Sequence, residues 1–167
     1  MSPLFKPLVL DNDVISTFFL VGVLKRVLSI WPRGSFYVPA RVVSEAREWT
    51  SRGQELISIL EELESKGIIT IISLDEDSEE EITAYAKLRL EKRLGEGESA
   101  SIAMAYNRGF NAATDDGEAR KACKELYPNV KTIGSGTLLN WAEKDGIIDR
   151  SEAVKIRESL DQFFDKS

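Results

Sequence analysis

The stretch Leu94–Asp116, with the sequence LGEGESASIAMAYNRGFNAATDD, carries the strongest signals for the fold. It opens with two glutamates set between glycines and continues as a predicted helix rich in small residues. Gly109 is placed to end that helix, because glycine is the usual residue just after a helix. A short strand over residues 111–114 then stops at Asp115 and Asp116. A strand that stops at acids puts them at the carboxyl edge of a sheet, where open α/β folds carry their sites.

The composition of the chain limits the possible chemistry. The chain has 167 residues, which predicts one domain spanning residues 1–167, and a formal net charge of -6. This charge argues against a non-specific binder of polyphosphate, which would need a basic surface. The absence of histidine excludes Ser-His-Asp and Cys-His catalysis as well as histidine-based zinc sites. Any catalysis must therefore rest on carboxylates, hydroxyls, lysines or arginines.

Cysteine content and hydropathy indicate where the protein works. Cys123 is the one cysteine, so no internal disulfide can form, and its helical pattern predicts a plain buried thiol. No secretory signal is visible at the start of the chain. The longest apolar stretch, Val14–Leu24, is too short to span a bilayer. We therefore expect a cytoplasmic protein with no membrane association.

Short apolar runs separated by helical patterns predict the fold class. The predicted strands cover residues 8–10, 36–38, 68–73, 111–114 and 130–133. The predicted helices cover residues 40–50, 54–65, 75–93, 117–126, 137–144 and 151–164, in addition to the helix of the opening stretch. Strands that alternate with helices indicate an α/β fold with three layers and a five-stranded parallel sheet flanked by helices. The apolar stretch 14–31 predicts a pair of core helices, with an interface on part of its surface as the alternative.

Acidic residues stand at several places that a parallel sheet brings together. Asp11 follows the first strand, Glu98 begins the helix before the fourth strand, and Asp115 and Asp116 follow that strand. Two carboxylates in close contact repel each other by about 4 kcal/mol at an effective dielectric near 20. Protons, basic partners or a divalent cation must offset this repulsion. An all-oxygen donor set without His or Cys suits Mg²⁺ or Mn²⁺.

Each of these acids also has a purely structural interpretation. Asp11 or Asp13 would cap the following helix, and Asp115 stands three residues before Glu118, as in a capping box. Glu98 would only favour a helix N-terminus. Glu45 is harder to explain in this way. It falls in the apolar stripe of the helix over residues 40–50, where a carboxylate is costly unless it is paired, protonated or metal-bound.

Several segments resemble PIN-domain nucleases. They are LVLDNDVIS (8–16), VPARVVSEA (38–46), LGEGESASIAMAYNRG (94–109) and AATDDGEARKA (112–122). The tail VKTIGSGTLLNWAEKDGII (130–148) is similar to a VapC-like prokaryotic subgroup of that family. The resemblance covers nearly the whole chain. It implies the PIN-like fold, with a five-stranded parallel sheet.

The resemblance also implies roles for individual residues. The catalytic acids map onto Asp11, Glu45, Glu98 and Asp116, and the metal ligands onto Asp11, Asp116, Glu98 and Asp115. Thr114 would orient an acid or the attacking water. Asp13 departs from the family, which usually has Ser, Thr or Asn there, and adds a charge beside the site. Arg120 and Arg41 are the expected phosphate contacts, although Arg120 is equally consistent with a solvated helix residue or an ion pair.

The resulting hypothesis is a Mg²⁺- or Mn²⁺-dependent endoribonuclease that cleaves RNA by metal-activated water. In the family it resembles, many small members are toxins held by an antitoxin protein, often as homodimers, and others process RNA. One alternative is a non-catalytic PIN-like binding or scaffold domain, although such members tend to have lost acids. The other is an Asp-dependent phosphatase, suggested by Asp11 and Asp13 after the first strand. Phosphatases of that kind need a further lysine and usually a cap domain, and neither is evident.

Overall fold

The computed structural model describes residues 6–29 and 31–165, without the side chains of Leu160 and residues 162–165. A five-stranded sheet in the order β3-β2-β1-β4-β5 forms its centre, and every pairing in the sheet is parallel. The strands are β1 (Leu8–Leu10), β2 (Phe36–Pro39), β3 (Ile69–Ile72), β4 (Asn111–Ala113) and β5 (Thr132–Ile133). The predicted parallel α/β sheet is thus confirmed, with strand ends that differ from the predicted ones by two residues or less.

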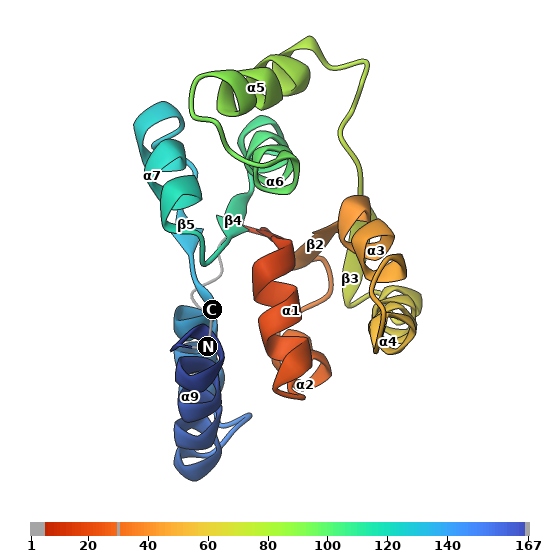
Figure 1. Cartoon of the computed structure of the whole chain (residues 1–167), viewed down its shortest axis with the longest axis vertical. Helices are drawn as coiled ribbons and strands as arrows, with labels where there is room; N and C mark the ends of the chain where they lie inside the picture. Colours follow the sequence, from red (N-terminus) through yellow and green to blue (C-terminus); the bar gives the residue numbers. More distant parts are fainter. Residues whose placement is uncertain (1–5, 30, 166–167) are drawn as a thin grey trace.

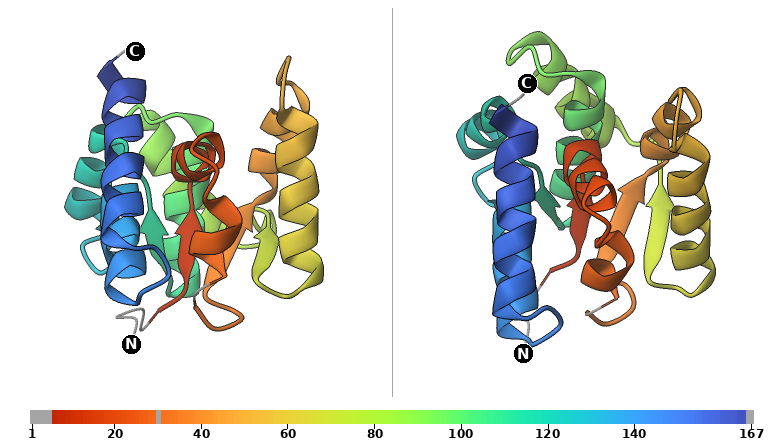
Figure 2. Two further views of the ribbon diagram at one scale, coloured as in Figure 1. Left: turned by 90° about the horizontal axis from the view of Figure 1, so that it is seen from below. Right: turned by 60° about the horizontal axis from the view of Figure 1, so that its bottom comes forward.

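Helices cover both faces of the sheet and make it a three-layer fold. They are α1 (Asn12–Leu20), α2 (Leu24–Leu28), α3 (Ala40–Arg47), α4 (Gly53–Ser65), α5 (Glu79–Leu90), α6 (Glu96–Arg108), α7 (Gly117–Leu126), α8 (Ser135–Lys144) and α9 (Arg150–Asp165). Figure 1 shows α5, α6 and α7 above the sheet, and α1, α2, α4 and α9 below it. The long helices α4 and α9 stand on either side of α1 in Figure 2. The first strand is therefore covered on both faces.

Two apolar cores follow from this arrangement. Leu8 and Leu10 belong to the core under α1, α2, α4 and α8, whereas Val9 belongs to the core under α6 and α7. Successive side chains of a strand point to opposite faces, so an all-apolar run is what a central strand of a parallel sheet requires. Phe18 and Phe36 are fully buried in the first core.

The apolar stretch 14–31 is mainly core. It forms α1 and α2, which are separated by a turn at Gly22 with φ +79°. Val14, Phe18 and Leu28 are completely buried, while Leu20 is 39% exposed. The predicted core helix pair is confirmed over the described part of this stretch, and residue 30 lies outside the described residues.

The order of the strands determines where a site can form. The chain leaves β1 toward β2 and β3 and then crosses back to β4, which pairs with the other side of β1. The register places Leu8 beside Asn111 and Leu10 beside Ala113. The residues that follow Leu10 and Ala113 therefore meet at the carboxyl edge. This is the point where the winding direction reverses, and open α/β sheets leave a crevice there.

The predicted helix over residues 75–93 is shorter than expected. The helix α5 begins at Glu79, because the hydroxyl of Ser78 caps it by accepting the N–H of Glu81 at 3.2 Å. The sequence pattern places Ile82, Tyr85, Ala86 and Leu90 on the apolar side of this helix, and the structure differs. Leu90 is 79% exposed, and the buried face consists of Glu81, Ala84 and Leu88.

The buried glutamate explains this rotation of α5. Glu81 has no exposed surface, and the guanidinium of Arg108 at the end of α6 approaches its Oε1 at 3.0 Å. Asn107 donates to Oε2 at 3.4 Å. Arg108 also donates to the carbonyl of Ser73 at 2.6 Å, just after β3. A buried carboxylate with these donors fixes α5 against α6.

Removing the positive partner of this pair tests its structural role. We expect Arg108→Met to lower the free energy of unfolding by about 3 kcal/mol, because Glu81 would be left buried without its counter-charge. The value is at the low end for a broken buried pair, since the Arg108 side chain is 25% exposed. Denaturant unfolding measures it. Lys66→Met, which breaks an exposed pair with Glu62, is the control and should change stability by less than about 1 kcal/mol. Equal effects of the two changes would contradict the role of Glu81.

Candidate active site

A buried threonine connects the two strands that meet at the centre of the carboxyl edge. Thr114 directly follows β4 and is 2% exposed. Its hydroxyl lies 3.2 Å from Oδ2 of Asp11 and 3.4 Å from Oδ2 of Asp13, so it donates to acids that follow β1. The same oxygen accepts the backbone N–H of Asp116 at 3.2 Å. One hydroxyl thus ties the end of β1 to the end of β4.

Asp11 is the most deeply buried acid of this cluster. It is 5% exposed, and its Oδ1 accepts the N–H of Asn12 at 2.8 Å, at the N-cap of α1. Burial raises the pKa of Asp11 to about 7, and the negative charges of Asp13 and Glu98 add to the shift. Its position at the helix start confirms the structural interpretation as a cap. A cap does not need this burial or these like-charged neighbours.

Asp13 connects the two halves of the cluster. Its carboxylate accepts the backbone N–H of Val14 at 2.7 Å and that of Asp115 at 3.0 Å. The pKa of Asp13 is raised, chiefly by burial, and the charges of Asp115 and Asp116 contribute. The extra acid expected beside the site therefore holds the loop after β4 in place.

The two acids after β4 have different surroundings. Asp116 is the N-cap of α7, where its Oδ1 accepts the N–H groups of Glu118 at 2.8 Å and Ala119 at 3.1 Å. The capping interpretation of Asp115 is therefore wrong for α7, because the cap is the next residue. Asp115 instead accepts the N–H of Ser135 at 2.7 Å, at the start of α8. Its other oxygen, Oδ2, is buried and accepts no hydrogen bond from any described residue.

Glu98 approaches from the first turn of α6. Its Oε2 accepts the N–H of Gly95 at 3.0 Å, which fixes the side chain across the start of the helix. Burial and the negative charge of Asp116 raise the pKa of Glu98. The acids at positions 11, 13, 98, 115 and 116 therefore interact with one another, although they come from three separate segments of the chain.

Glu45 lies at the rim of this cluster. The sequence places Glu45 in the apolar stripe of α3, but its side chain is 33% exposed and pairs with Arg41, at 3.0 Å between Oε1 and Nε. Arg41 also contacts Glu96 at 2.6 Å, and so joins α3 to α6. Glu45 nevertheless lines a small cavity together with Asp11. The structure thus places it next to the buried acids without direct contact.

Arg120 has a defined position behind the site. Its Nε donates to the backbone carbonyl of Thr114 at 3.0 Å, and its guanidinium lies against Gly134. A Cβ at Gly134 would come within 2.5 Å of the Arg120 guanidinium and 2.7 Å of Asp115. Glycine at this position thus allows a close approach. Arg120 is half-buried and forms no ion pair with an acid among the residues that the structure describes, and its contact with phosphate stays a prediction.

The donor atoms of the cluster suit a hard cation, although the side chains are not arranged around a common point as metal ligands would be. No group of three or more Asp, Glu or Cys side chains among the described residues is arranged to hold a metal ion. The available donors are carboxylate oxygens, one of them the unpartnered buried Oδ2 of Asp115. Oxygen-only donors are those that Mg²⁺ and Mn²⁺ prefer. The residues therefore fit such an ion by donor type and charge.

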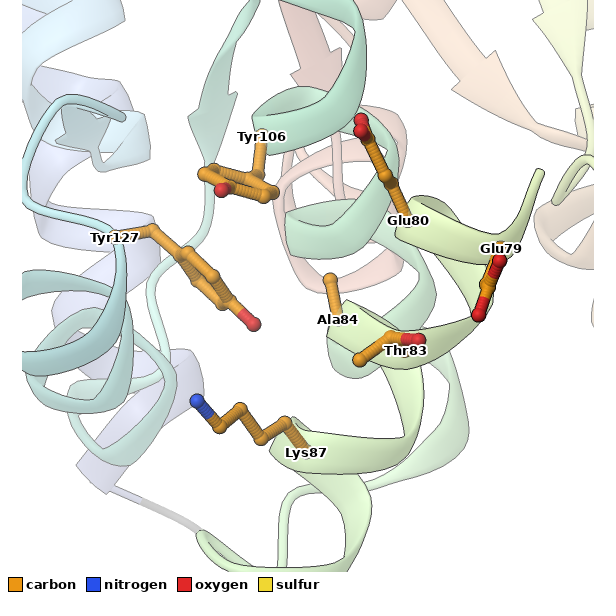
Figure 3. Close-up of a pocket in the computed structure, with 7 residues that line it drawn as sticks. All are labelled: Glu79, Glu80, Thr83, Ala84, Lys87, Tyr106 and Tyr127. Atoms are coloured by element: carbon orange, nitrogen blue, oxygen red, sulfur yellow. The ribbon is translucent and has the colours of Figure 1, made fainter.

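Other notable features lie away from these acids. A hollow of about 450 Å³ lies between α5, α6 and the end of α7, where Tyr106, Tyr127 and Lys87 line it (Figure 3). Cys123 is buried nearby, and burial raises the pKa of its thiol to about 11. The prediction of a plain buried thiol is confirmed.

None of the described helices has both the length and the apolar character needed to cross a membrane.

A family model described as "DUF3368: PIN domain" matches residues 7–166. The chain belongs to the PIN-domain family. The match covers almost the whole sequence and confirms the resemblance seen in the motifs. It also argues against the Asp-dependent phosphatase. No curated protein sequence matches this PIN domain.

Solved structures support the same fold. A "Toxin-antitoxin complex from Klebsiella pneumoniae" aligns with a TM-score of 0.50 and 15% identity, over 73% of this chain and 93% of the other. FitAcB from Neisseria gonorrhoeae aligns with a TM-score of 0.54 and 20% identity, over 77% and 97%. FitAB bound to an IR36 DNA fragment aligns with a TM-score of 0.54 and 17% identity, over 77% and 94%. At identities this low, the alignments show that this PIN domain shares its architecture with these proteins, and nothing more specific.

The raised pKa of Asp11 leads to a prediction about stability. The folded protein holds this proton more tightly than the unfolded chain, so the contribution of Asp11 to stability decreases as pH rises from about 3.8 to about 7. At pH 8, without metal, the Asp11→Asn variant should therefore melt at a higher temperature than the wild type. The corresponding difference in the free energy of unfolding between variant and wild type is roughly 4 kcal/mol at most. It should disappear near pH 4.

Thermal unfolding in the presence of EDTA at both pH values measures this effect. Asp77→Asn removes an exposed acid outside the cluster and serves as the matched control. It should show no comparable dependence on pH. An Asp11→Asn protein that is no more stable than the wild type at pH 8 would contradict the effect of burial and repulsion on Asp11.

Proposed function

We propose that this PIN domain is a metal-dependent endoribonuclease. The observation that carries the proposal is the convergence of Asp11, Glu98, Asp115 and Asp116 at the junction of β1 and β4. Their burial and mutual repulsion raise the pKa of two of them, Asp11 and Glu98. A protein keeps such an unfavourable arrangement where it serves a function. Membership in the PIN-domain family supports a nuclease as that function.

The proposed cation is Mg²⁺ or Mn²⁺, with Asp11 and Asp116 as its main ligands. Glu98 and Asp115 would complete the donor set. When bound, such an ion lowers the pKa of a water molecule and offsets negative charge at the phosphate. Because the acids are not arranged around a common point, binding would draw them together as their repulsion is removed. Thr114, which contacts Asp11 and the backbone of Asp116, would keep the two main ligands in register.

Arg41 is the better placed of the two arginines for a phosphate contact. Its side chain is 45% exposed at the rim, where it pairs with Glu45 and Glu96. A phosphate group would have to share or replace one of these carboxylates. Arg120 lies behind the loop after β4 and holds the Thr114 carbonyl. We therefore propose Arg41 for substrate binding and Arg120 for support of the loop.

A non-catalytic scaffold domain is the alternative. A scaffold would not need the buried Asp11 or the acids around it. It would neither cleave RNA nor gain stability from Mn²⁺. The complete set of acids therefore favours the nuclease.

Substitution of the two main ligands tests the nuclease. Asp11→Asn and Asp116→Asn should each reduce Mn²⁺-dependent cleavage of RNA by more than about 100-fold, beyond the effect typical of outer-shell changes around a metal. Asparagine caps helices as well as aspartate does, so both variants should fold. Cleavage of a labelled single-stranded RNA measures activity, and circular dichroism verifies the fold. Asp77→Asn should cleave like the wild type. Undiminished cleavage by Asp11→Asn would reject the assignment.

We further propose that the protein acts as the toxin of a toxin–antitoxin pair, with an antitoxin protein as its partner and a homodimer as its assembly. The solved structures with the same fold include a toxin–antitoxin complex, which supports this narrower role. RNA processing is the alternative.

Controlled expression in a bacterial host separates the two roles. The wild-type protein should arrest growth soon after induction, because cleavage of cellular RNA stops protein synthesis. Asp116→Asn, produced in equal amount, should allow normal growth. Normal growth with wild-type protein that cleaves RNA after purification would reject the toxin role and favour RNA processing.

A further inference from the structure

Four charged side chains from three helices form one ion network at the rim of the acid cluster. Arg41 of α3 pairs with Glu45 on the same helix, and its Nη2 lies 2.6 Å from Oε2 of Glu96 on α6. On the other side of Glu96, Nη2 of Arg89 on α5 lies 4.0 Å from Oε1. The carboxylate of Glu96 therefore stands between two guanidinium groups.

Each of these guanidinium groups is anchored by a second contact that does not involve Glu96. Arg41 donates from Nε to Oε1 of Glu45 at 3.0 Å, and Arg89 donates from Nη1 to the carbonyl of Leu94 at 2.8 Å. An arginine presents its donors in a fixed fork that suits carboxylate and phosphate alike. Without the Glu96 carboxylate, two anchored guanidinium groups would flank one place for an anion.

The network adjoins the buried acids. Arg41 and Gly97 belong to the lining of the small cavity that also touches Asp11. Gly97 directly follows Glu96 in α6, and the next residue, Glu98, interacts with the acid cluster. An anion bound between the two arginines would therefore lie beside the proposed metal ligands.

The members of this place are open to solvent. The side chains of Arg41, Glu96 and Arg89 are 45%, 47% and 38% exposed. Exposed ion pairs contribute little to stability, so the network is a weak structural link. A phosphate group carries a full negative charge and can accept hydrogen bonds from both forks. It can thus replace the carboxylate without a change in the fold.

We propose that Arg41 and Arg89 form a clamp for a backbone phosphate of single-stranded RNA, and that Glu96 occupies this clamp until RNA displaces it. Arg89 is then a second substrate-binding residue, and Glu96 competes with the substrate. The proposal rests on the proposed nuclease function, because it takes RNA as the ligand. A chain with a net charge of -6 needs local positive groups to hold a polyanion, and the clamp supplies two of them beside the acids.

Two substitutions with opposite expected effects test the clamp. Arg89→Gln should weaken binding of a labelled single-stranded RNA by about tenfold, because one contact between charged groups is lost. The slope of log affinity against log salt concentration should decrease in magnitude by about 0.7. Glu96→Gln should tighten binding by up to about fivefold, since the competing charge is removed. Fluorescence anisotropy measures both effects, in an Asp116→Asn background so that the RNA stays intact.

The chain offers a matched control for each substitution. Glu62→Gln, near the end of α4, also removes an exposed carboxylate that lies between two cations, Lys25 at 2.5 Å and Lys66 at 3.4 Å. Arg150→Gln, at the start of α9, removes an exposed arginine that pairs with Glu143 at 3.1 Å. Each control changes the net charge as its counterpart does. Neither should alter RNA affinity by more than about twofold, because salt screens charges that lie far from the ligand.

The signs of the effects separate a clamp from a structural link. A network that only braced the helices would be damaged by either change, so Arg89→Gln and Glu96→Gln would both weaken binding, and this result would overturn the proposal. Unchanged affinity in Arg89→Gln, or no RNA binding in the Asp116→Asn background, would overturn it as well. Absence of Mn²⁺-dependent cleavage by the wild type would reject the nuclease instead, and the binding data would still decide on the clamp.

Discussion

The site depends on a repulsion that the fold enforces. Backbone pairing of β1 with β4 brings the segments after Leu10 and Ala113 to the same point, and both segments begin with acids. The single hydroxyl of Thr114 and the backbone amides of residues 12, 14 and 115 hold these carboxylates close together. Hydrogen bonds to carboxylates offset part of their repulsion but do not cancel it, and the raised pKa of Asp11 reflects the remainder.

The N-termini of three helices also help to hold the acids together. Asp11 caps α1 and Asp116 caps α7, while Glu98 lies in the first turn of α6. The positive end of a helix dipole stabilises a nearby negative charge. The starts of these helices therefore meet at the carboxyl edge and help to retain several acids there. Capping and a functional role are compatible for the same residue, so the observed caps do not argue against the proposed function of these acids.

The sequence predicted those features that depend on local patterns. Apolar runs that stop at acids located β1 and β4, and parallel pairing then placed Asp11 beside Thr114, two residues before Asp116. Features that depend on tertiary contacts were missed. The buried face of α5 is set by Arg108 of another helix, and a helix periodicity cannot report a partner that lies elsewhere in the chain. The exposure of Glu45 was missed because α3 packs with one side at the rim of the fold, which the periodicity of a single helix does not reveal.

The strand order has a consequence for the synthesis of the protein. Leu8 pairs with Asn111, so the first strand must wait for more than half of the chain before its neighbour on that side exists. Contacts so distant along the chain form late in folding, and a ribosome delivers the chain from its N-terminal end. A nascent chain released early would carry the first acids without their counterparts. An incomplete product of translation would thus lack the assembled acidic cluster, which exists only once β4 and the segment after it have been made.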